Sequence, residues 1–381
     1  MKKSILICSG LFLAFCSFAG EWGGTFSNLT EFAGKESDLK LIQKDGVSLW
    51  GKLPISKDNE SYLYGDISYN FKYDGQDDSL RSINNILNVN NLSANFNWKI
   101  GEVSKIQLKA GRFSVVDGTS SIFTQNSDGI LAGFKNDKIN FSVFASYTGF
   151  LNSKSTEMVD LSLFGLNSDY TESDNDFYTF AAKYIPVSVS VKVPFRAQNF
   201  IFQGWGVFDA NGSNINRFYA TLGLNGFLTR HFSYNLVSSF GSRNFENISN
   251  LSKLSFSTLW GNFIFSLNGV YASGKNGKFS SFIGVTKQSA IYAKTNTEYS
   301  GVILAGFNAS YLFGKIVSVV GSFDTVFNAQ NEVEYRGVQA KAGVFWNIFS
   351  DLRLGSSVRY FIAKESEQNK LTVDLALNFV F

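Results

Sequence analysis

Apolar and polar residues alternate along much of this chain. In the last eleven residues, LTVDLALNFVF, mostly polar or small residues separate six apolar ones: Leu371, Val373, Leu375, Leu377, Phe379 and Phe381. The same period of two recurs in LSANFNWKI (92–100), IQLKA (106–110), INFSVFASY (139–147) and LRLGSSVRYFI (352–362). Successive side chains of a strand point to opposite faces, so the pattern predicts strands with one apolar face.

Two kinds of connection alternate between these segments. One kind is tight and has hairpin-turn chemistry, at 101–102, 136–137, 229–230, 261–262, 314–315 and 350–351. The other kind is longer and polar, at 34–45, 74–86, 117–127, 151–174, 210–214, 243–249, 275–297, 329–333 and 365–369. Tight and long connections are therefore expected at opposite ends of one antiparallel sheet.

We expect about 18 strands, at 24–33, 46–55, 61–73, 87–100, 104–116, 128–135, 138–150, 175–191, 197–209, 215–227, 231–242, 250–261, 263–274, 298–313, 316–328, 334–347, 352–364 and 370–381. The phase of the alternation changes in FYTFAAKYIPVSVSVKV, which predicts a bulge at Pro186. A broken strand there would reduce the count to 16.

Soluble sandwiches and propellers also alternate, but their strands usually run about 5–6 residues. The expected strands run about 10–14 residues, a length that crosses a bilayer at a tilt. No blade-length repeat is present. Hydrocarbon cannot satisfy an open sheet edge, so the sheet must close. The prediction is a transmembrane antiparallel β-barrel over residues 20–381, with short periplasmic turns and longer extracellular loops.

Composition and the first residues agree with an exported barrel. Aromatic residues make up 16% of the chain, with 39 Phe, and Pro, which breaks ladders, occurs 3 times. MKKSILICSGLFLAFCSFAG has two lysines, a short apolar run and small residues, which predicts a signal peptide over 1–19. Both cysteines lie in it, so no disulfide or thiolate chemistry is expected in the mature chain. Without Lys2 and Lys3, 32 basic residues face 31 acidic ones, a balance that does not suggest nucleic acid.

The C-terminal segment resembles the assembly signal of bacterial outer-membrane proteins. In that class the last strand has alternate apolar residues and a terminal aromatic, as Leu371, Val373, Leu375, Leu377, Phe379 and Phe381 do here. The resemblance implies an outer-membrane location, with outer-membrane lipid, the barrel-assembly machinery and periplasmic chaperones as partners. It also explains why a chain ends inside a strand pattern: the last strand must pair with the first.

A second resemblance lies in KAGRFSVVDGTSSIFTQNSDGILAGF (109–134). Gly111-Arg112 ends a strand, Asp117 lies in a loop, and Asp128-Gly129 opens the next strand. This is similar to a short pattern in 18-stranded substrate-selective porins, including the alginate-export type. The NPA motif of outer-membrane fatty-acid transporters is not found.

Residues between the lipid-facing ones are expected to line the lumen. The basic ones are Lys52, Lys99, Lys109, Lys183, Arg217, Lys341, Arg353 and Arg359, together with Arg112 if Gly111 shifts the phase. The acidic ones are Asp66, Asp324 and Asp374. Charges of one sign bias which ions pass, so the excess predicts a mild anion preference. The alternative is that these charges only solvate the wall or pair across it.

Three loops and one histidine complete the candidates. Loops 117–127 and 275–297 are expected to narrow the pore or cover its mouth, whereas 151–174 is acidic and is expected to be a solvated surface loop rather than a cation site. The one histidine, His231, adjoins a predicted turn, so a catalytic histidine constellation is not expected. No metal cluster, phosphate loop or cofactor fingerprint is present.

The favoured function is a porin for passive diffusion of small hydrophilic solutes, not an enzyme, with no cofactor and no nucleic-acid partner. The alternatives are a surface adhesin or structural barrel that acts through its loops, and a transporter of hydrophobic substrates. A plugged lumen would favour the first alternative, and a lateral gap or an apolar lumen would favour the second.

Overall fold

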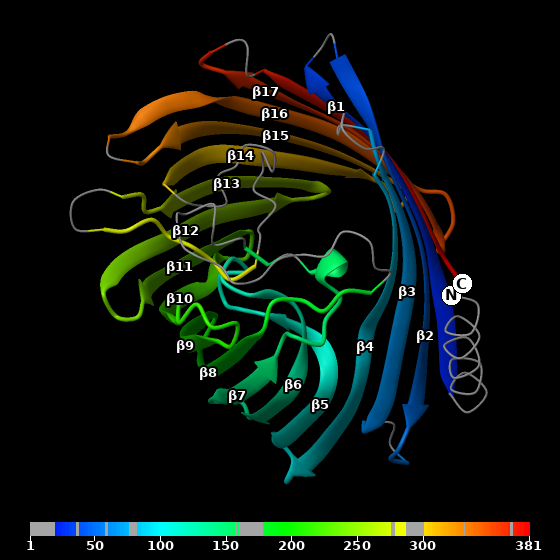
Figure 1. Ribbon diagram of the computed structural model, residues 1–381, viewed down its shortest axis with the longest axis vertical. Coiled ribbons are helices and arrows are strands. Elements are labelled where there is room, and N and C mark those ends of the chain that lie inside the picture. The colour runs from blue at the N-terminus through cyan, green and yellow to red at the C-terminus, as the bar shows by residue number, and fades with distance from the viewer. Residues whose placement is uncertain are drawn as a thin grey trace.

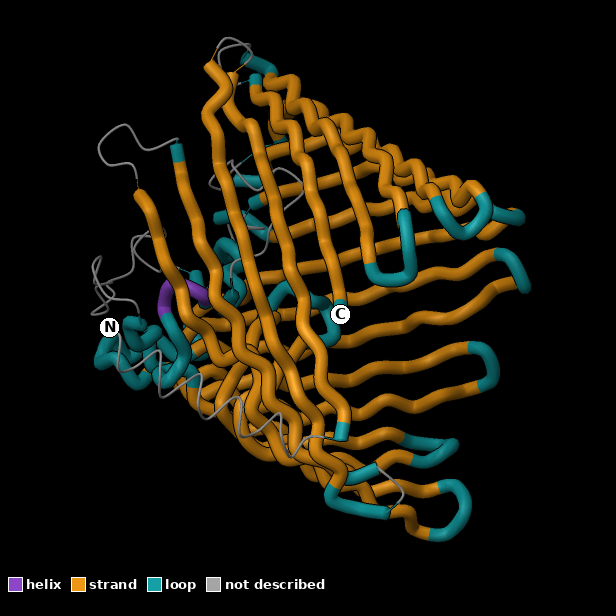
Figure 2. The backbone as a smooth tube through the Cα atoms, turned by 90° about the vertical axis from the view of Figure 1, so that its right-hand side faces the viewer, coloured by secondary structure: helices purple, strands orange, loops and turns teal. Residues whose placement is uncertain are grey.

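All 18 strands join into one antiparallel sheet that closes on itself (Figure 1, Figure 2). The structure, a computed structural model, describes residues 20–35, 38–57, 60–75, 82–156, 158–159, 178–275, 279–286, 301–330, 332–365 and 369–381. The predicted signal peptide and most of loop 151–174 lie outside these residues. The predicted strand number and barrel fold are confirmed.

Each strand pairs with its neighbours in sequence. The strands of the first half are β1 (Glu21–Lys35), β2 (Asp38–Pro54), β3 (Tyr62–Asp74), β4 (Ser82–Ile100), β5 (Ser104–Val116), β6 (Thr124–Lys135), β7 (Asn140–Tyr147), β8 (Tyr184–Phe195) and β9 (Gln198–Asp209). Those of the second half are β10 (Arg217–Thr229), β11 (Phe232–Arg243), β12 (Asn247–Trp260), β13 (Phe263–Ala272), β14 (Val302–Phe313), β15 (Val317–Asn328), β16 (Glu334–Asn347), β17 (Leu352–Ala363) and β18 (Lys370–Val380).

The last strand closes the barrel against the first. β18 pairs with β1 from Val380 opposite Thr25 to Leu371 opposite Gly34. Phe381 continues the contact, because its N–H donates to Gly24 O (3.0 Å) and its O accepts from Gly24 N (2.8 Å). The C-terminal residue is therefore held by backbone hydrogen bonds and does not fray.

The tight turns lie at one end of the sheet, and three of the predicted turns contain a glycine in the left-handed backbone conformation. Gly101, Gly261 and Gly314 have φ of 65°, 59° and 60°, a conformation that costs glycine little. The long connections gather at the opposite end. We call these the turn end and the loop end.

The outer surface of the barrel is apolar. Large hydrophobic side chains with exposed fractions near one half lie on β5, β9, β13 and β16, for example Leu267 at 51% and Phe202 at 50%. Such a belt on a closed sheet suits hydrocarbon and would be unfavourable in water. Among the described residues, no helix is long and apolar enough to cross a membrane.

Two predicted boundaries were wrong. The predicted loop 34–45 is mostly strand: β1 and β2 stay paired as far as Lys35 opposite Asp38. The polar residues there resembled a loop, but Lys35, Lys40 and Lys44 face the lumen, and Gln43 and Asp45 lie on the outer face. The predicted bulge at Pro186 is also absent, since β8 pairs with β9 in unbroken register from Tyr184 to Phe195. The apparent phase change arises because residues before Tyr184 do not belong to this strand.

The pairing between neighbouring strands of the wall is incomplete between β4 and β5. Their ladder runs only from Ile100 opposite Ser104 to Leu92 opposite Arg112. Towards the loop end, residues 148–156 take over the contact with β4. Asn152 Nδ2 donates to Leu87 O (2.9 Å), and the short 3₁₀ helix Ser153–Ser155 lies inside the ring of strands (Figure 1).

Arg112 sits where the two strands separate. Its guanidinium binds both carboxylate oxygens of Asp128 at 2.8 Å, Phe150 O at 2.8 Å and Val89 O at 3.3 Å. The register does not shift at Gly111, so Arg112 has the opposite orientation to Phe113, which packs in the lumen. The predicted lumen position of Arg112 is thus wrong, and its contacts close the wall.

We expect Arg112→Ala to lower the free energy of unfolding by about 3–5 kcal/mol. The substitution removes the cation of a largely buried ion pair and leaves the Asp128 carboxylate without a partner for its charge. Urea unfolding followed by tryptophan fluorescence measures the change. Lys72→Ala removes the more exposed pair with Asp74 and should cost below about 1 kcal/mol. Equal losses for the two variants would contradict the assigned role of Arg112.

We also expect Gly24→Val to impair closure. A Cβ at Gly24 would lie 2.4 Å from the Phe381 ring and 2.9 Å from Leu49, whereas one at Gly204 meets nothing within 4 Å. Overpacking of this kind typically costs about 1–3 kcal/mol, so the folded, heat-modifiable fraction on gels should fall for Gly24→Val. Gly204→Val is the matched control and should fold like the wild type.

Candidate solute pathway

Two segments from distant parts of the chain fold into the barrel. Lys253 of β12 donates from Nζ to Thr119 O (2.9 Å), and Gly118 N donates to Gln203 Oε1 of β9 (2.7 Å). Tyr219 and Arg217 of β10 donate to Ile283 O (2.6 Å) and Gly284 O (2.9 Å). We call residues 117–123 and 279–286 together the lumen shelf.

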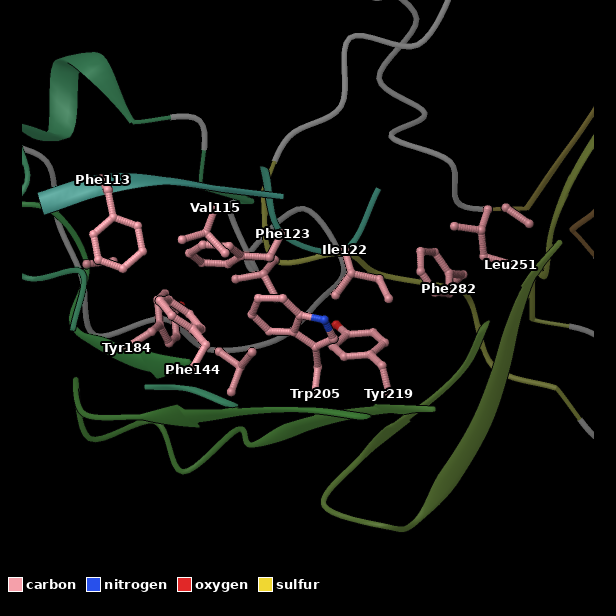
Figure 3. Packing of buried hydrophobic residues seen from close by; sticks show 14 residues of the cluster. Phe113, Val115, Ile122, Phe123, Phe144, Tyr184, Trp205, Tyr219, Leu251 and Phe282 are labelled. Carbon is pink, nitrogen blue, oxygen red and sulfur yellow. The ribbon is translucent and has the colours of Figure 1, made fainter. Parts of the chain in front are cut away.

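The shelf has its own apolar core. Ile122, Phe123, Phe282 and Val285 are buried against inward side chains of β5, β7, β9 and β10 (Figure 3), namely Phe113, Val115, Phe144, Trp205, Val207 and Tyr219. The Phe123 and Trp205 rings stack with centroids 5.4 Å apart. Val285 N donates to Ile122 O at 2.7 Å, which joins the two segments. The expectation that loops 117–127 and 275–297 turn inward therefore holds for their described parts.

Asp117 organises the first segment. Its Oδ1 accepts from the N–H groups of Ser121, Ile122 and Phe123 at 2.8–3.0 Å, and its Oδ2 accepts from Thr119 N and Oγ1. The residue is only 2% exposed. A carboxylate that accepts several N–H bonds fixes a tight loop, so Asp117 sets the shape of the shelf.

These contacts identify the inward rows of the sheet. Because paired residues share a face, the inward orientation of Tyr219 and Lys253 propagates around the ladders. By this reasoning, four of the predicted lumen residues face inward, and each has a partner. Lys52 lies 3.3 Å from Glu21, and Arg359 lies 3.6 Å from Asp374. Lys109 lies 4.7 Å from the centre of the Phe113 ring, and Asp66 accepts a hydrogen bond from Asn90. Lys341 and Arg353 also face inward, and Lys341 has no ion pair among the described residues.

Lys99 lies inward at the turn end and is neutralised. It forms an ion pair with Glu60, which also binds Lys105 at 3.0 Å. Hydrogen bonds from Lys99 and then from Lys105 hold the pKa of the Glu60 carboxyl below its usual value. Near neutral pH, the Glu60 carboxylate at the turn end therefore contacts two ammonium groups, those of Lys99 and Lys105.

Two other predicted residues face inward but are covered. Arg217 is 1% exposed and lies over the Tyr184 ring at 4.9 Å, so it holds the shelf and is closed to solute. Asp324 is 2% exposed, opposite Gln339. Oδ2 of Asp324 has no hydrogen-bond partner among the described residues.

Lys183 is not where the sequence placed it. It precedes β8, is exposed, and its backbone O accepts from Ala210 N at the loop end. The inward residue at this point is Tyr184, paired with Asp209. The prediction assumed that the strand extends back to 175, which the structure contradicts.

Other inward residues were missed. Lys44 and Lys72 face each other across the β2–β3 ladder, and Lys253 lies on the same face of β12 as Ser255 and Ser257. Lys72 lies between Phe71 and Tyr73, which face outward, and this position could have identified it, whereas Lys44 lies between the polar Gln43 and Asp45. The inward aromatics Phe113 and Phe144 were harder to assign, because an apolar residue that packs on a lumen loop looks in sequence like one that faces lipid.

The accessible inner wall is opposite the shelf. Trp205 and Tyr219, which pack under the shelf, are at most 5% exposed, whereas Lys44 and Arg353 are exposed and Lys72, Lys341 and Arg359 are partly exposed. These five accessible cations lie on β2, β3, β16 and β17. His231 lies in the β10–β11 turn, away from this wall.

We expect Asp117→Ala to raise single-channel conductance, because the loss of its hydrogen bonds, roughly 1.5–3 kcal/mol for a charged acceptor, releases the shelf from one fixed conformation. Planar-bilayer recording measures it. Asp209→Ala is the matched control: Asp209 also caps a loop, through Asn211, Ser213 and Asn214, but at the loop end. Unchanged conductance and noise for Asp117→Ala would contradict a constricting shelf.

Comparison with known proteins finds similarity in structure and not in sequence. No family model and no curated protein matches. OpdL of Pseudomonas aeruginosa superposes with a TM-score of 0.66 at 9% identity, covering 94% of this chain and 98% of that one. OpdK of the same organism, solved with vanillate, gives 0.62 at 10% (96% and 99%), and Acinetobacter baumannii OccAB2 gives 0.62 at 9% (96% and 99%). The resemblance to 18-stranded substrate-selective porins is thereby confirmed for the fold.

Proposed function

We propose that this chain is an outer-membrane porin that lets small hydrophilic solutes diffuse through a water-filled barrel, with a mild preference for anions. The observation that carries the proposal is the contrast inside the barrel. One side is filled by the lumen shelf, and the other keeps accessible cations on its inner wall. Export through the predicted signal peptide and insertion by the barrel-assembly machinery belong to the same proposal.

The anion preference rests on cations that lack a full complement of carboxylates. Lys341 lies directly opposite Arg359 in the β16–β17 ladder, and Lys44 opposite Lys72. Like charges directly opposite one another are unfavourable, so an anion between them would relieve the repulsion. Asp374 and Asp74 offset part of this charge, which makes the expected preference mild. The vanillate in the OpdK structure is a carboxylate and supports an anionic solute by analogy.

The hydrophobic-transporter alternative has one observation in its favour, the short β4–β5 ladder. Against it, residues 148–156 and Arg112 close that gap, and the apolar lumen residues are buried under the shelf. The adhesin alternative depends on loops that are mostly outside the described residues. A folded barrel that does not conduct would favour it over the porin.

The test is the reversal potential of single channels under a salt gradient. We expect open steps with mild anion preference for the wild type. For Lys341→Glu, which reverses a wall charge next to Arg359, the anion-to-cation permeability ratio should fall about two- to tenfold at low salt and less at high salt.

Lys315→Glu makes the same charge change at an exposed turn and should leave the ratio near that of the wild type. Cation preference in the wild type, or equal shifts in both variants, would contradict selection by the inner wall.

A further inference from the structure

Four polar side chains lie together on the outer surface of β1 and β2. Asn28 pairs with Asp45 in the β1–β2 ladder, and Thr30 pairs with Gln43. Their neighbours on β18 are Leu377 and Leu375, two of the outward apolar residues of the last strand. We call Asn28, Thr30, Gln43 and Asp45 the outer tetrad.

The tetrad is connected but incomplete. Asn28 Nδ2 and Gln43 Nε2 donate to the same oxygen, Asp45 Oδ1, at 2.5 and 3.0 Å, and Thr30 Oγ1 donates to Gln43 Oε1 at 2.8 Å. No described residue donates to Asp45 Oδ2 or forms an ion pair with this carboxylate. Each of the two amides keeps a second N–H, since an amide nitrogen carries two hydrogens. The set thus presents an acceptor and two donors outward.

Apolar residues enclose the tetrad along both strands. Phe26 (39% exposed) and Phe32 (37%) flank it on β1, and Val47 (42%) and Leu41 (37%) flank it on β2. It therefore lies within the apolar belt and not at its rim.

Asp45 stands out among the outward positions. Only two other charged residues lie on the outward rows of the described strands, if the bulged end of β16 is left aside. They are Arg112 and Asp128, which neutralise each other. A charged side chain on the lipid face of a barrel is destabilising, most of all near the middle of the membrane. An anion without a cation here indicates a surface that hydrocarbon does not cover.

The same face allows close approach. Gly51 of β2 and Gly65 of β3 are directly paired on the outward rows, towards the turn end from the tetrad. Small residues that permit close contact, beside polar groups that hydrogen-bond across it, characterise protein–protein contacts within membranes.

We propose that the outer tetrad is a contact between two copies of this chain, formed by the outer faces of β1 and β2. The set is complementary to itself: the spare N–H of Asn28 or Gln43 in one copy can donate to Asp45 Oδ2 of the other. In a two-fold contact, residue i of one copy meets residue j of the second and the reverse, so both carboxylates gain a donor. Acyl chains offer no donor. The proposal requires the barrel to lie in a membrane and is independent of whether it conducts.

The first experiment measures the mass of the folded mature chain in lipid nanodiscs by mass photometry over a range of concentrations. We expect dimers for the wild type, as a two-fold contact requires. Asp45→Leu should raise the dissociation concentration at least tenfold, and the variant with Asn28→Leu, Thr30→Val, Gln43→Leu and Asp45→Leu should be monomeric. Heat-modifiable mobility checks that each variant is folded.

A matched control makes the same polar-to-apolar change elsewhere on the outer wall. Thr325→Val with Ser356→Leu alters outward positions of β15 and β17 and should leave the assembly intact.

The mature chain has no cysteine, so single cysteines report proximity. Val47→Cys, beside the tetrad, should cross-link between copies under oxidation, whereas Val319→Cys, exposed on β15, should not.

Three results would overturn the proposal. The wild type could be monomeric at every concentration, the assembly could survive replacement of the tetrad, or the tetrad variants could lose a bound lipid or a different protein instead of a second copy. Each would assign the face to another occupant or to none.

Discussion

Backbone hydrogen bonding dictates this architecture, because hydrocarbon offers neither a donor nor an acceptor to a free strand edge. The chain meets that requirement by joining β18 to β1 through to Phe381. Closure then fixes the orientation of every side chain, since a shift of one residue in any ladder would exchange the inner and outer faces. The lysines of the inner wall, the aromatic belt and the shelf contacts all depend on this register.

A barrel of 18 strands is too wide for wall side chains alone to fill, and wide barrels leave a channel or are plugged. Among the described residues, the shelf fills the side lined by β5, β7, β9 and β10. Asp117 stiffens the shelf through backbone N–H groups, and Phe123 and Phe282 give it a core against Trp205 and Tyr219. Apolar burial inside the barrel thus separates a dry side from a charged side.

Alternation was sufficient to predict the strand number, the tight turns and the inward orientation of most charges that were assigned to the lumen, because period two is a direct consequence of the pleat. It failed where long-range contacts decide. Arg112 was assigned to the lumen on the assumption that Gly111 shifts the phase, yet the ladder continues unbroken and the arginine closes the wall.

Lys183 and the inward aromatics show the same limit. Lys183 was misplaced because the start of β8 depends on pairing with β9, which one segment's pattern does not reveal. The pattern also gives no sign that Phe113 and Phe144 pack on a shelf built from residues more than 100 positions apart. Gln43 and Asp45 of the outer tetrad were assigned to a loop for a related reason: the sequence alone does not show which kind of surface a strand faces.

The two halves of the joint between β4 and β5 are held by different kinds of contact. Along its turn half, successive backbone pairs hold the two strands. Along its loop half, Arg112 of β5 binds Val89 O of β4, and Asn152 of residues 148–156 binds Leu87 O of β4. Side-chain bonds can exchange partners one at a time, whereas a ladder must unzip. A cylinder without seams would respond evenly to lateral pressure in the bilayer. In this wall, the loop half of the joint can loosen one side chain at a time, whereas its turn half can part only by unzipping the ladder.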